Sequence, residues 1–291
     1  MNRFLGYLVE LEPLIDGFSN ISDPSLLQST VAKNADFLLP FREHGPSRTQ
    51  ARGPSRTFDP SHAKTRTGLF NGLLFRGITF SSEFGRQPAA NFHDSPSAFT
   101  AACAQYPDAA SDFFCNPYAY SRRKSKRNVS LVGEYWAAVM ERGHGQTWET
   151  MANAAKFSFT DCYKFLSGGR PGHFKEIGSL AGFLLAADFV YAGVVAAPTA
   201  EEVGTIIRDI NKGAVKGLEV LHLITPRTRG SKRGYRMADV EEVRAKFVRL
   251  YKFLDQKLTD AQKVRMVFDA IMVENGLCKI TRVVGGKIYV L

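Results

Sequence analysis

Cysteine is scarce in this chain and is not arranged for metal binding or for a disulfide framework. The 291 residues include four cysteines, Cys103, Cys115, Cys162 and Cys278, and no two of them form a CxxC pair. The six histidines are scattered as well, so no zinc-site spacing can be assembled. We therefore interpret the cysteines as reduced thiols of an intracellular protein. We expect no metal site and no cofactor, and the sequence leaves metal dependence open.

Long uninterrupted hydrophobic runs are also missing. Residues 1–17 mix apolar side chains with Glu10, Glu12 and Asp16, which predicts a first amphipathic helix instead of a signal peptide. Residues 179–197 are long enough to cross a bilayer, but Asp188 lies at their centre, where burial in lipid is costly. This stretch is better interpreted as a buried helix, so we expect no membrane partner.

Alternating patterns typical of strands are scarce, and only the final KIYVL looks extended. Apolar residues instead recur at the three- and four-residue spacing of amphipathic helices. Three capping patterns mark helix starts: Thr199 with Glu202, Asp239 with Glu242, and Thr259 with Gln262. We predict a mostly α fold, with N-terminal helices over residues 1–41 packed on a main helical domain over residues 67–291.

Acidic residues are too few to balance the basic ones. The chain has 38 Lys and Arg residues against 28 Asp and Glu residues, which gives a formal net charge of +10. Such a surplus indicates an anionic partner, and nucleic acid, an anionic membrane or a phosphorylated substrate are the usual ones.

Basic residues gather in three segments that lack an apolar stripe. The segment Arg42 to Arg66 contains GPSRT twice and is predicted to be a mobile basic loop between the N-terminal helices and the main domain. The others are residues 121–128 (SRRKSKRN) and residues 227–236 (RTRGSKRGYR). One such segment would be an ordinary solvated loop, but three can converge on one phosphate-bearing surface. The cations expected to bind DNA are Arg122, Arg123, Lys124, Lys126, Arg127, Arg229, Lys232 and Arg233.

The middle of the chain resembles a helix-hairpin-helix unit. A helix is expected to end near Leu166, and a Gly/Pro-rich link with an Ile177–Gly178 turn precedes the apolar helix. In such units the exposed N–H groups at the start of the second helix hold a DNA phosphate. Gly178 and Ser179 would take that role here. The common turn has a second glycine, at the position that Leu180 occupies in this chain.

Asp188 lies about three turns into the apolar helix. A carboxylate in such surroundings caps another element, pairs with an arginine, or acts as a base whose pKa is raised by burial. The residues alone leave structural pairing and catalysis open.

Four segments, taken in order, resemble one protein family. They are GLFNGLLFRGITF (68–80), EIGSLAGFLLAADFVYAG (176–193), KGAVKGLEVL (212–221) and VENGLCKITR (273–282). Together they resemble the α-glutamyl/putrescinyl-thymine pyrophosphorylase family of thymine-hypermodifying bacteriophages, which is related to helix-hairpin-helix DNA glycosylases. Two positions depart from the family pattern. The family usually has an Asn after its FR stretch, and here Ile78 and Thr79 stand nearby instead; Lys279 stands where an acid is usual.

The resemblance implies a transferase that acts on DNA. It would displace pyrophosphate from pyrophosphorylated 5-hydroxymethyluracil by using an amino acid or a polyamine as the nucleophile. The substrate base would be flipped out of a DNA duplex, and an upstream DNA-base kinase would supply it. The place of action would be the cytoplasm of a phage-infected bacterial host.

The implied reaction assigns roles to residues in the motifs. The cations that would neutralise departing pyrophosphate are Arg76, Lys279 and Arg282. Asp188 and Glu274 are candidates for the base that accepts the proton of the attacking amine. Cys278 could add to C6 of the pyrimidine, or it could be a small residue on a packed helix face. If the helix continues, Glu274, Cys278 and Arg282 lie on one face at successive steps of four residues.

Two other functions fit the same residues. A DNA glycosylase or lyase on this scaffold would use Asp188, but it would usually need a lysine in the hairpin turn, where Ser179 and Leu180 stand. A basic nucleic-acid-binding protein without catalysis would need only the three basic segments.

Overall fold

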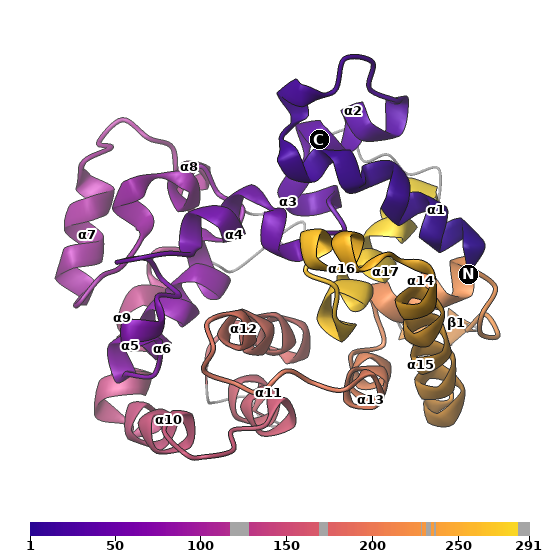
Figure 1. Cartoon of the computed structure of the whole chain (residues 1–291). Helices are drawn as coiled ribbons and strands as arrows, with labels where there is room; N and C mark the ends of the chain where they lie inside the picture. The colour runs from indigo at the N-terminus through magenta and orange to yellow at the C-terminus, as the bar shows by residue number, and fades with distance from the viewer. Residues whose placement is uncertain (117–127, 169–173, 228, 231–233, 236, 285–291) are drawn as a thin grey trace. The chain divides into compact units, whose positions relative to one another are not determined.

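The computed structural model describes residues 1–116, 128–168, 174–227, 229–230, 234–235 and 237–284. The described part of the chain is mostly helical, which confirms the predicted fold class. The chain divides into two compact units: unit 1 comprises Met1–Gly45 and Pro198–Leu291, and unit 2 comprises Pro46–Ala197. This division differs from the expected one, because the N-terminal helices form one unit with the C-terminal third of the chain (Figure 1).

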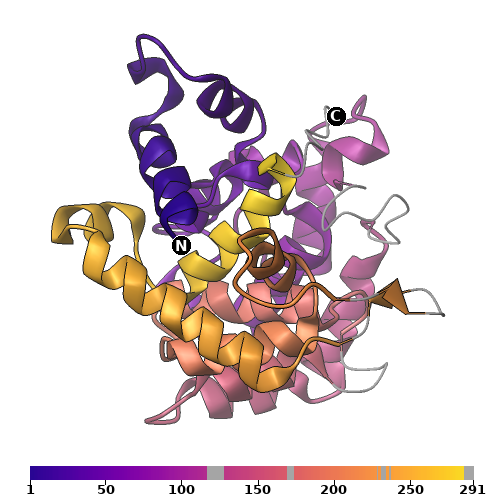
Figure 2. The same cartoon turned by 90° about the vertical axis from the view of Figure 1, so that its right-hand side faces the viewer.

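Unit 1 is built from helices of both ends of the chain. Its helices are α1 (Asn2–Leu11), α2 (Leu26–Lys33), α3 (Ala35–Leu38), α13 (Ala200–Ile210), α14 (Gly213–Val220), α15 (Val240–Lys257), α16 (Asp260–Met266) and α17 (Ala270–Val284). Three short 3₁₀ turns are η1 (Glu12–Asp16), η2 (Phe18–Asn20) and η3 (Arg42–His44). Two short antiparallel strands, β1 (Arg229–Gly230) and β2 (Gly234–Tyr235), pair Arg229 with Tyr235. Figure 2 shows α15 as the long gold helix of this unit.

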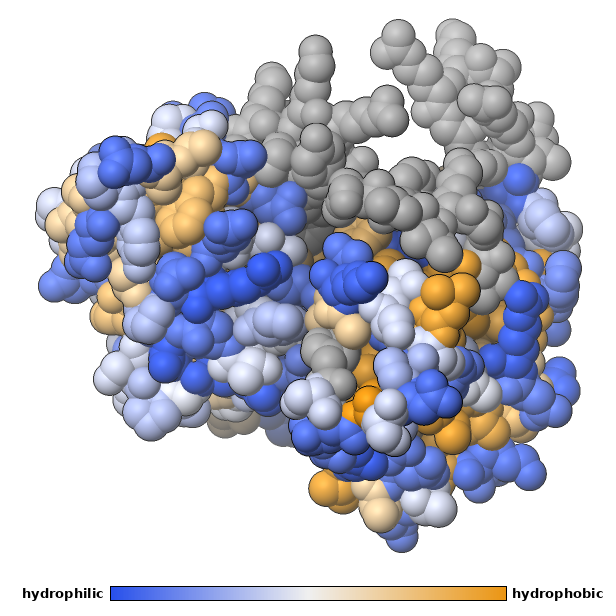
Figure 3. All heavy atoms as spheres, turned by 90° about the horizontal axis from the view of Figure 1, so that it is seen from above, coloured by the Kyte–Doolittle hydropathy of each residue, from blue (hydrophilic) through white to orange (hydrophobic). Residues whose placement is uncertain are grey.

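In its described residues, unit 2 contains helices joined by turns and irregular segments, and no strand. Its α-helices are α4 (Pro46–Ala51), α5 (Pro60–Ala63), α6 (Arg66–Leu74), α7 (Pro96–Ala104), α8 (Ser111–Phe114), α9 (Leu131–Trp136), α10 (His144–Ala152), α11 (Phe159–Ser167) and α12 (Ser179–Tyr191). Two π-helical segments continue α6 and α9, and they are η4 (Phe75–Thr79) and η8 (Ala137–Glu141). The 3₁₀ turns are η5 (Phe84–Arg86) and η6 (Pro88–Ala90). On the face drawn in Figure 3, hydrophilic residues predominate and hydrophobic ones form separate small groups.

The predicted capping patterns mark true helix starts. Thr199 and Thr259 each form a complete capping box, at the starts of α13 and α16. Asp239 accepts a hydrogen bond from the backbone N–H of Glu242, but the Glu242 carboxylate accepts from Thr225 instead of closing a box. Local hydrogen bonding of this kind can be recognised in sequence because its partners are three residues apart.

The prediction of an irregular loop from Arg42 to Arg66 was wrong. The segment contains η3, α4 and α5, and it ends at the first residue of α6. Arg42 and Arg48 are buried, as are Ser47 and Phe58. The composition of this segment is typical of a solvated loop. Two of its arginines are nevertheless buried, which requires that other residues pack around them.

Apolar helix α12 is buried, as expected, and it ends at Tyr191, well before Ala197. In the described residues, no helix is long and apolar enough to span a membrane. Helix α11 packs along α12 (Figure 1), and the helix-hairpin-helix unit between them stays a prediction. Gly178 is the N-cap of α12 and Ser179 its first residue, and glycine supplies no side-chain cap at this helix start. Residues 169–173 of the link lie outside the described residues.

Most of the cations expected to bind DNA lie outside the described residues. This holds for Arg122, Arg123, Lys124, Lys126, Arg127, Lys232 and Arg233, and also for the KIYVL segment. Arg227, at the start of the third basic segment, is described, and its side chain is 4% exposed. Its guanidinium binds the Glu219 carboxylate and both oxygens of Asn211, so it fastens this segment to α14.

Helix α17 is packed against its neighbours through glycines. Gly213 and Gly217, one turn apart on α14, face Cys278 and the Leu277 backbone so closely that a Cβ at either position would overlap α17. Gly276, on α17 itself, leaves room for the Phe4 ring of α1. The two glycines of KGAVKGLEVL therefore set the separation between α14 and α17.

Replacement of Gly217 by Ala should destabilise the protein by about 1–3 kcal/mol, because the new methyl group would meet the Leu277 carbonyl oxygen. Gly6→Ala is the matched control, since Gly6 is in the interior of α1 with open space around it. That control should stabilise the protein by up to about 1 kcal/mol through helix propensity. Chemical denaturation of both variants measures the difference, and equal stabilities would contradict the close packing.

Candidate functional site

Asp188 lies in a buried ion cluster of unit 2. Its side chain is 0% exposed. Arg76 donates two hydrogen bonds to the carboxylate: Nε donates to Oδ2, and Nη2 donates to Oδ1 at 2.7 Å. Arg48 Nη1 lies 3.1 Å from the same Oδ1. The carboxylate thus pairs with arginines, which is one of the roles the sequence left open for it.

Arg76 reaches Asp188 from the π-helical segment η4. Gly77 follows it, and a Cβ there would overlap the Tyr135 ring, so the chain at this turn lies directly on α9. The Arg76 guanidinium also stacks on two aromatic rings, at 5.0 Å from the Phe75 centroid and 4.2 Å from the Phe80 centroid. Single π-turns within helices are frequent at functional sites. Here the turn points a buried arginine at a buried carboxylate.

A second polar cluster lies on α17 of unit 1, at the motif VENGLCKITR. Glu274 is 4% exposed, and among the described residues its carboxylate has no hydrogen-bond partner. Burial raises the pKa of Glu274 to about 7, against the opposing effect of Arg42, Lys279 and Arg282 nearby. A carboxylic acid with this pKa is poised to exchange protons at neutral pH.

The other polar side chains of α17 bind main-chain carbonyls at the end of α3. Lys279 Nζ donates to Asp36 O at 3.0 Å, and Arg282 Nη1 donates to Phe37 O at 2.6 Å. Asn275 Nδ2 donates to Pro40 O at 2.6 Å and to Leu39 O at 3.3 Å. The Tyr7 hydroxyl donates to Leu38 O at 3.4 Å. Five consecutive carbonyls are therefore satisfied by side chains, as the end of a helix requires.

Lys279 has an unusual charge state for a lysine. Burial lowers its pKa to about 7, and repulsion by Arg282 acts in the same direction. Arg282 has a fixed charge and stacks on the Phe37 ring, with 3.9 Å between the guanidinium carbon and the centroid. The cluster therefore has one permanent cation on α17 and one that can gain or lose its proton near pH 7.

Cys278 lies on the same helix face as Glu274 and Arg282, as the spacing predicted. Its sulfur packs against Gly213 of α14 and accepts a long contact of 3.7 Å from Arg282 Nη2. These contacts are those of a small residue at a helix crossing. A chemical role for Cys278 stays a prediction.

The predicted site residues thus fall into two groups. Arg76 and Asp188 are paired in unit 2, and Glu274, Cys278, Lys279 and Arg282 share α17 in unit 1. Sequence reasoning missed Arg42 and Arg48, because both lie in the segment interpreted as a solvated loop. In the described residues, no three His, Cys, Asp or Glu side chains gather so that they could hold a metal ion.

Asp188→Asn should destabilise the protein by about 3–5 kcal/mol, because it removes the carboxylate that two buried guanidinium groups share. The matched control is Glu149→Gln, which breaks the half-exposed pair of Glu149 with Arg66 in the same unit. Its cost should stay below about 1 kcal/mol, since exposed pairs contribute little. Urea unfolding of both variants tests this, and a small effect at Asp188 would show that the ion cluster is dispensable for stability.

Comparison of the chain with protein-family models, with curated proteins and with solved structures finds no match. The resemblance to the thymine-modifying family therefore rests on the four ordered segments. The first segment contains Arg76 and the second contains Asp188, which pair in unit 2. The third segment contains Gly213 and Gly217, which pack against α17. The fourth is the polar face of α17 itself.

Proposed function

We propose that this protein modifies bases in DNA by transferring an amino acid or an amine to 5-pyrophosphoryloxymethyluracil. The observation that carries the proposal is the Glu274 carboxyl group, which is buried beside three basic side chains, has no hydrogen-bond partner among the described residues and has a pKa near 7. Buried acids that serve only stability are usually paired, as Asp188 is. An unpaired one with a shifted pKa is typical of a reaction centre.

The reaction needs a base and a cationic surface. The amine nitrogen attacks the exocyclic methylene carbon, and the bond from that carbon to the pyrophosphate oxygen breaks with its electron pair leaving on pyrophosphate. The proton released by the nitrogen passes to the Glu274 carboxylate. Arg42 and Arg282, whose charges act on Glu274, supply a positive field that favours the departing anion, and Lys279 adds to this field while it is protonated.

Asp188 has a supporting role in this proposal. Both of its oxygens bind arginine, and it has no exposed surface, so we assign the proton transfer to Glu274 and not to Asp188. The same occupancy argues against the glycosylase alternative, which would need Asp188 to reach a flipped nucleotide. Because the Arg76 guanidinium is bound to Asp188, any effect of its charge on the departing pyrophosphate would be exerted by the ion cluster as a whole.

Incubation of the protein with duplex DNA that contains 5-pyrophosphoryloxymethyluracil and a panel of amino acids and polyamines should release pyrophosphate and yield a new nucleoside. Nucleoside mass analysis and a pyrophosphate assay detect the two products. Unmodified DNA and DNA with 5-hydroxymethyluracil are the controls, and neither should react. Absence of both products with the whole panel would refute the proposal, and abasic sites in place of a new nucleoside would favour a glycosylase.

The rate of transfer should rise with pH through about 7, because Glu274 must lose its proton before it can accept one. Glu274→Gln should lower kcat by about 10²- to 10⁴-fold with DNA binding unchanged. Lys279→Met removes a charge that lowers the pKa of Glu274, so the rising limb should move to higher pH. The rate of transfer is measured as a function of pH for the wild type and the two variants. If the pH at which the rate rises is the same in Lys279→Met as in the wild type, Glu274 is excluded as the titrating group.

A further inference from the structure

Helix α15 has an exposed basic face that none of the predicted DNA-binding segments includes. The run from Val243 to Leu254 contains Arg244, Lys246, Arg249 and Lys252 and no acidic residue. Its apolar members Val243, Phe247, Leu250 and Leu254 are buried. The cations Arg244, Arg249 and Lys252 are exposed. The amphipathic pattern thus directs a set of positive charges outward along one helix.

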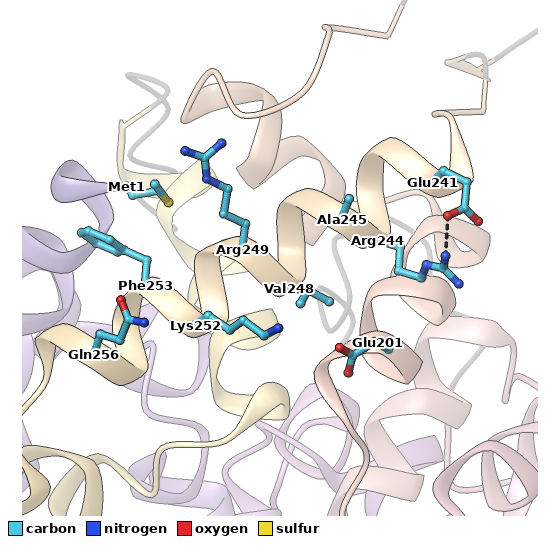
Figure 4. A pocket seen from close by; sticks show the side chains of 10 residues that line it. All are labelled: Met1, Glu201, Glu241, Arg244, Ala245, Val248, Arg249, Lys252, Phe253 and Gln256. Carbon is cyan, nitrogen blue, oxygen red and sulfur yellow. Dashed lines mark hydrogen bonds and ion pairs between the residues drawn. The ribbon is translucent and has the colours of Figure 1, made fainter.

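The exposed face of α15 forms the floor of a hollow of about 780 Å³ in unit 1 (Figure 4). Ala245 and Val248 lie in the middle of the floor, Glu201 of α13 lies on one side, and Met1 lies at one end. The residues at the end with Met1 are Arg249, Lys252, Phe253 and Gln256, and the Glu241–Arg244 pair lies at the opposite end. A small apolar floor with cations beside it lets a polymer backbone approach the helix closely.

The cations at the two ends differ in their partners. Arg244 forms an ion pair with Glu241, three residues before it. Arg249 and Lys252, one turn apart, have no ion pair or side-chain hydrogen bond among the described residues. Their Cα atoms are separated by about 4.5 Å along the helix axis, and Arg244 lies about 12 Å from Lys252 along that axis. This span equals the axial rise of about three to four nucleotides in one strand of B-DNA.

We propose that the α15 face binds the phosphodiester backbone of DNA, with Arg249 and Lys252 as its two main phosphate ligands. This inference rests on the proposed function for the identity of the partner, and it assigns that partner a surface. No acidic residue lies between Val243 and Leu254 in the sequence, and the cations Arg244, Arg249 and Lys252 outnumber the carboxylates Glu201 and Glu241 among the residues that line the hollow, so its net charge is complementary to phosphate. Glu241 restrains Arg244, so the opposite end of the hollow contributes less.

The test is the salt dependence of binding to an unmodified, fluorescently labelled DNA duplex, measured by anisotropy. In the double variant Arg249→Ala/Lys252→Ala, the slope of log K against log salt should fall by about 1.8, and affinity at 0.1 M salt should drop on the order of tenfold to a hundredfold. The control double variant Lys33→Ala/Lys257→Ala removes two exposed lysines of the same unit outside the hollow and should bind nearly as the wild type does. Arg249→Lys/Lys252→Arg keeps the charges and should retain the slope.

Glu241→Gln supplies a test in the opposite direction. It releases Arg244 from its ion pair, so the slope should increase by up to about 0.9 and binding should become tighter. A purely structural role of this face would not predict a gain. Melting temperatures of all variants should match the wild type, since the altered side chains are exposed.

The outcomes separate this inference from the proposed function. If the α15 variants bind DNA and transfer the amine as the control does, the inference is wrong and the function stands. If they lose DNA binding in the absence of any transfer activity in the wild type, the surface stands and the function falls. Equal loss in the control variant, or loss of binding to phosphatidylserine vesicles with DNA binding intact, would overturn the inference.

Discussion

Asp188 carries its charge at a position with no exposed surface, and two guanidinium groups offset the free energy of that burial. The three partners come from α4, η4 and α12, so the ion cluster ties the beginning of unit 2 to its last helix. Arg76 is aimed by a π-helical turn that lies against Tyr135, and Arg48 is fixed beside Phe58, 4.7 Å from the ring centroid. Phe58, Phe75 and Phe80 of unit 2 therefore pack around charged groups whose separation would cost a large free energy.

In the described residues of unit 1, the buried charged side chains of α17 do not form a comparable ion cluster. Lys279, Arg282 and Asn275 direct their donors to main-chain oxygens of residues 36–40, and the Glu274 carboxylate receives none of these donors. Burial therefore raises the pKa of this carboxyl group to about 7, and the nearby cations, which do not bind it, oppose that rise only in part. The Asp188 carboxylate of unit 2 is bound by arginines, whereas the Glu274 carboxylate of unit 1 is not bound by the cations near it. This difference is why we interpret the first as a stabilising ion cluster and the second as a candidate reaction centre.

The parts of this structure that sequence could predict are those with local causes. Helix starts at Thr199 and Thr259 follow from partners three residues away, and the buried character of α12 follows from its composition. The same reasoning placed Glu274, Cys278 and Arg282 on one face of α17. Sequence reasoning could not predict contacts between residues that are distant in sequence. Nothing near Arg48 indicates that it pairs with Asp188, and nothing near Lys279 indicates that it donates to the carbonyl of Asp36. Gly, Pro, Ser and Arg in residues 42–66 have the composition of a solvated loop, and only tertiary pairing shows that two of those arginines are buried.

The carbonyl contacts of α17 have a consequence for the substitutions that this protein can accept. A main-chain oxygen is present whatever the side chain, so residues 36, 39 and 40 can change identity without losing the bonds that Lys279 and Asn275 make to them. Phe37 also contributes its ring, to Arg282, and the charge of Asp36 acts on Lys279. These hydrogen bonds therefore restrict the side chains of α17 and not those of residues 36–40, where Leu38 and Leu39 are restricted by burial instead. An insertion or deletion between Ala35 and Phe41 would be far more damaging than any substitution there, because it would move all five oxygens out of register at once.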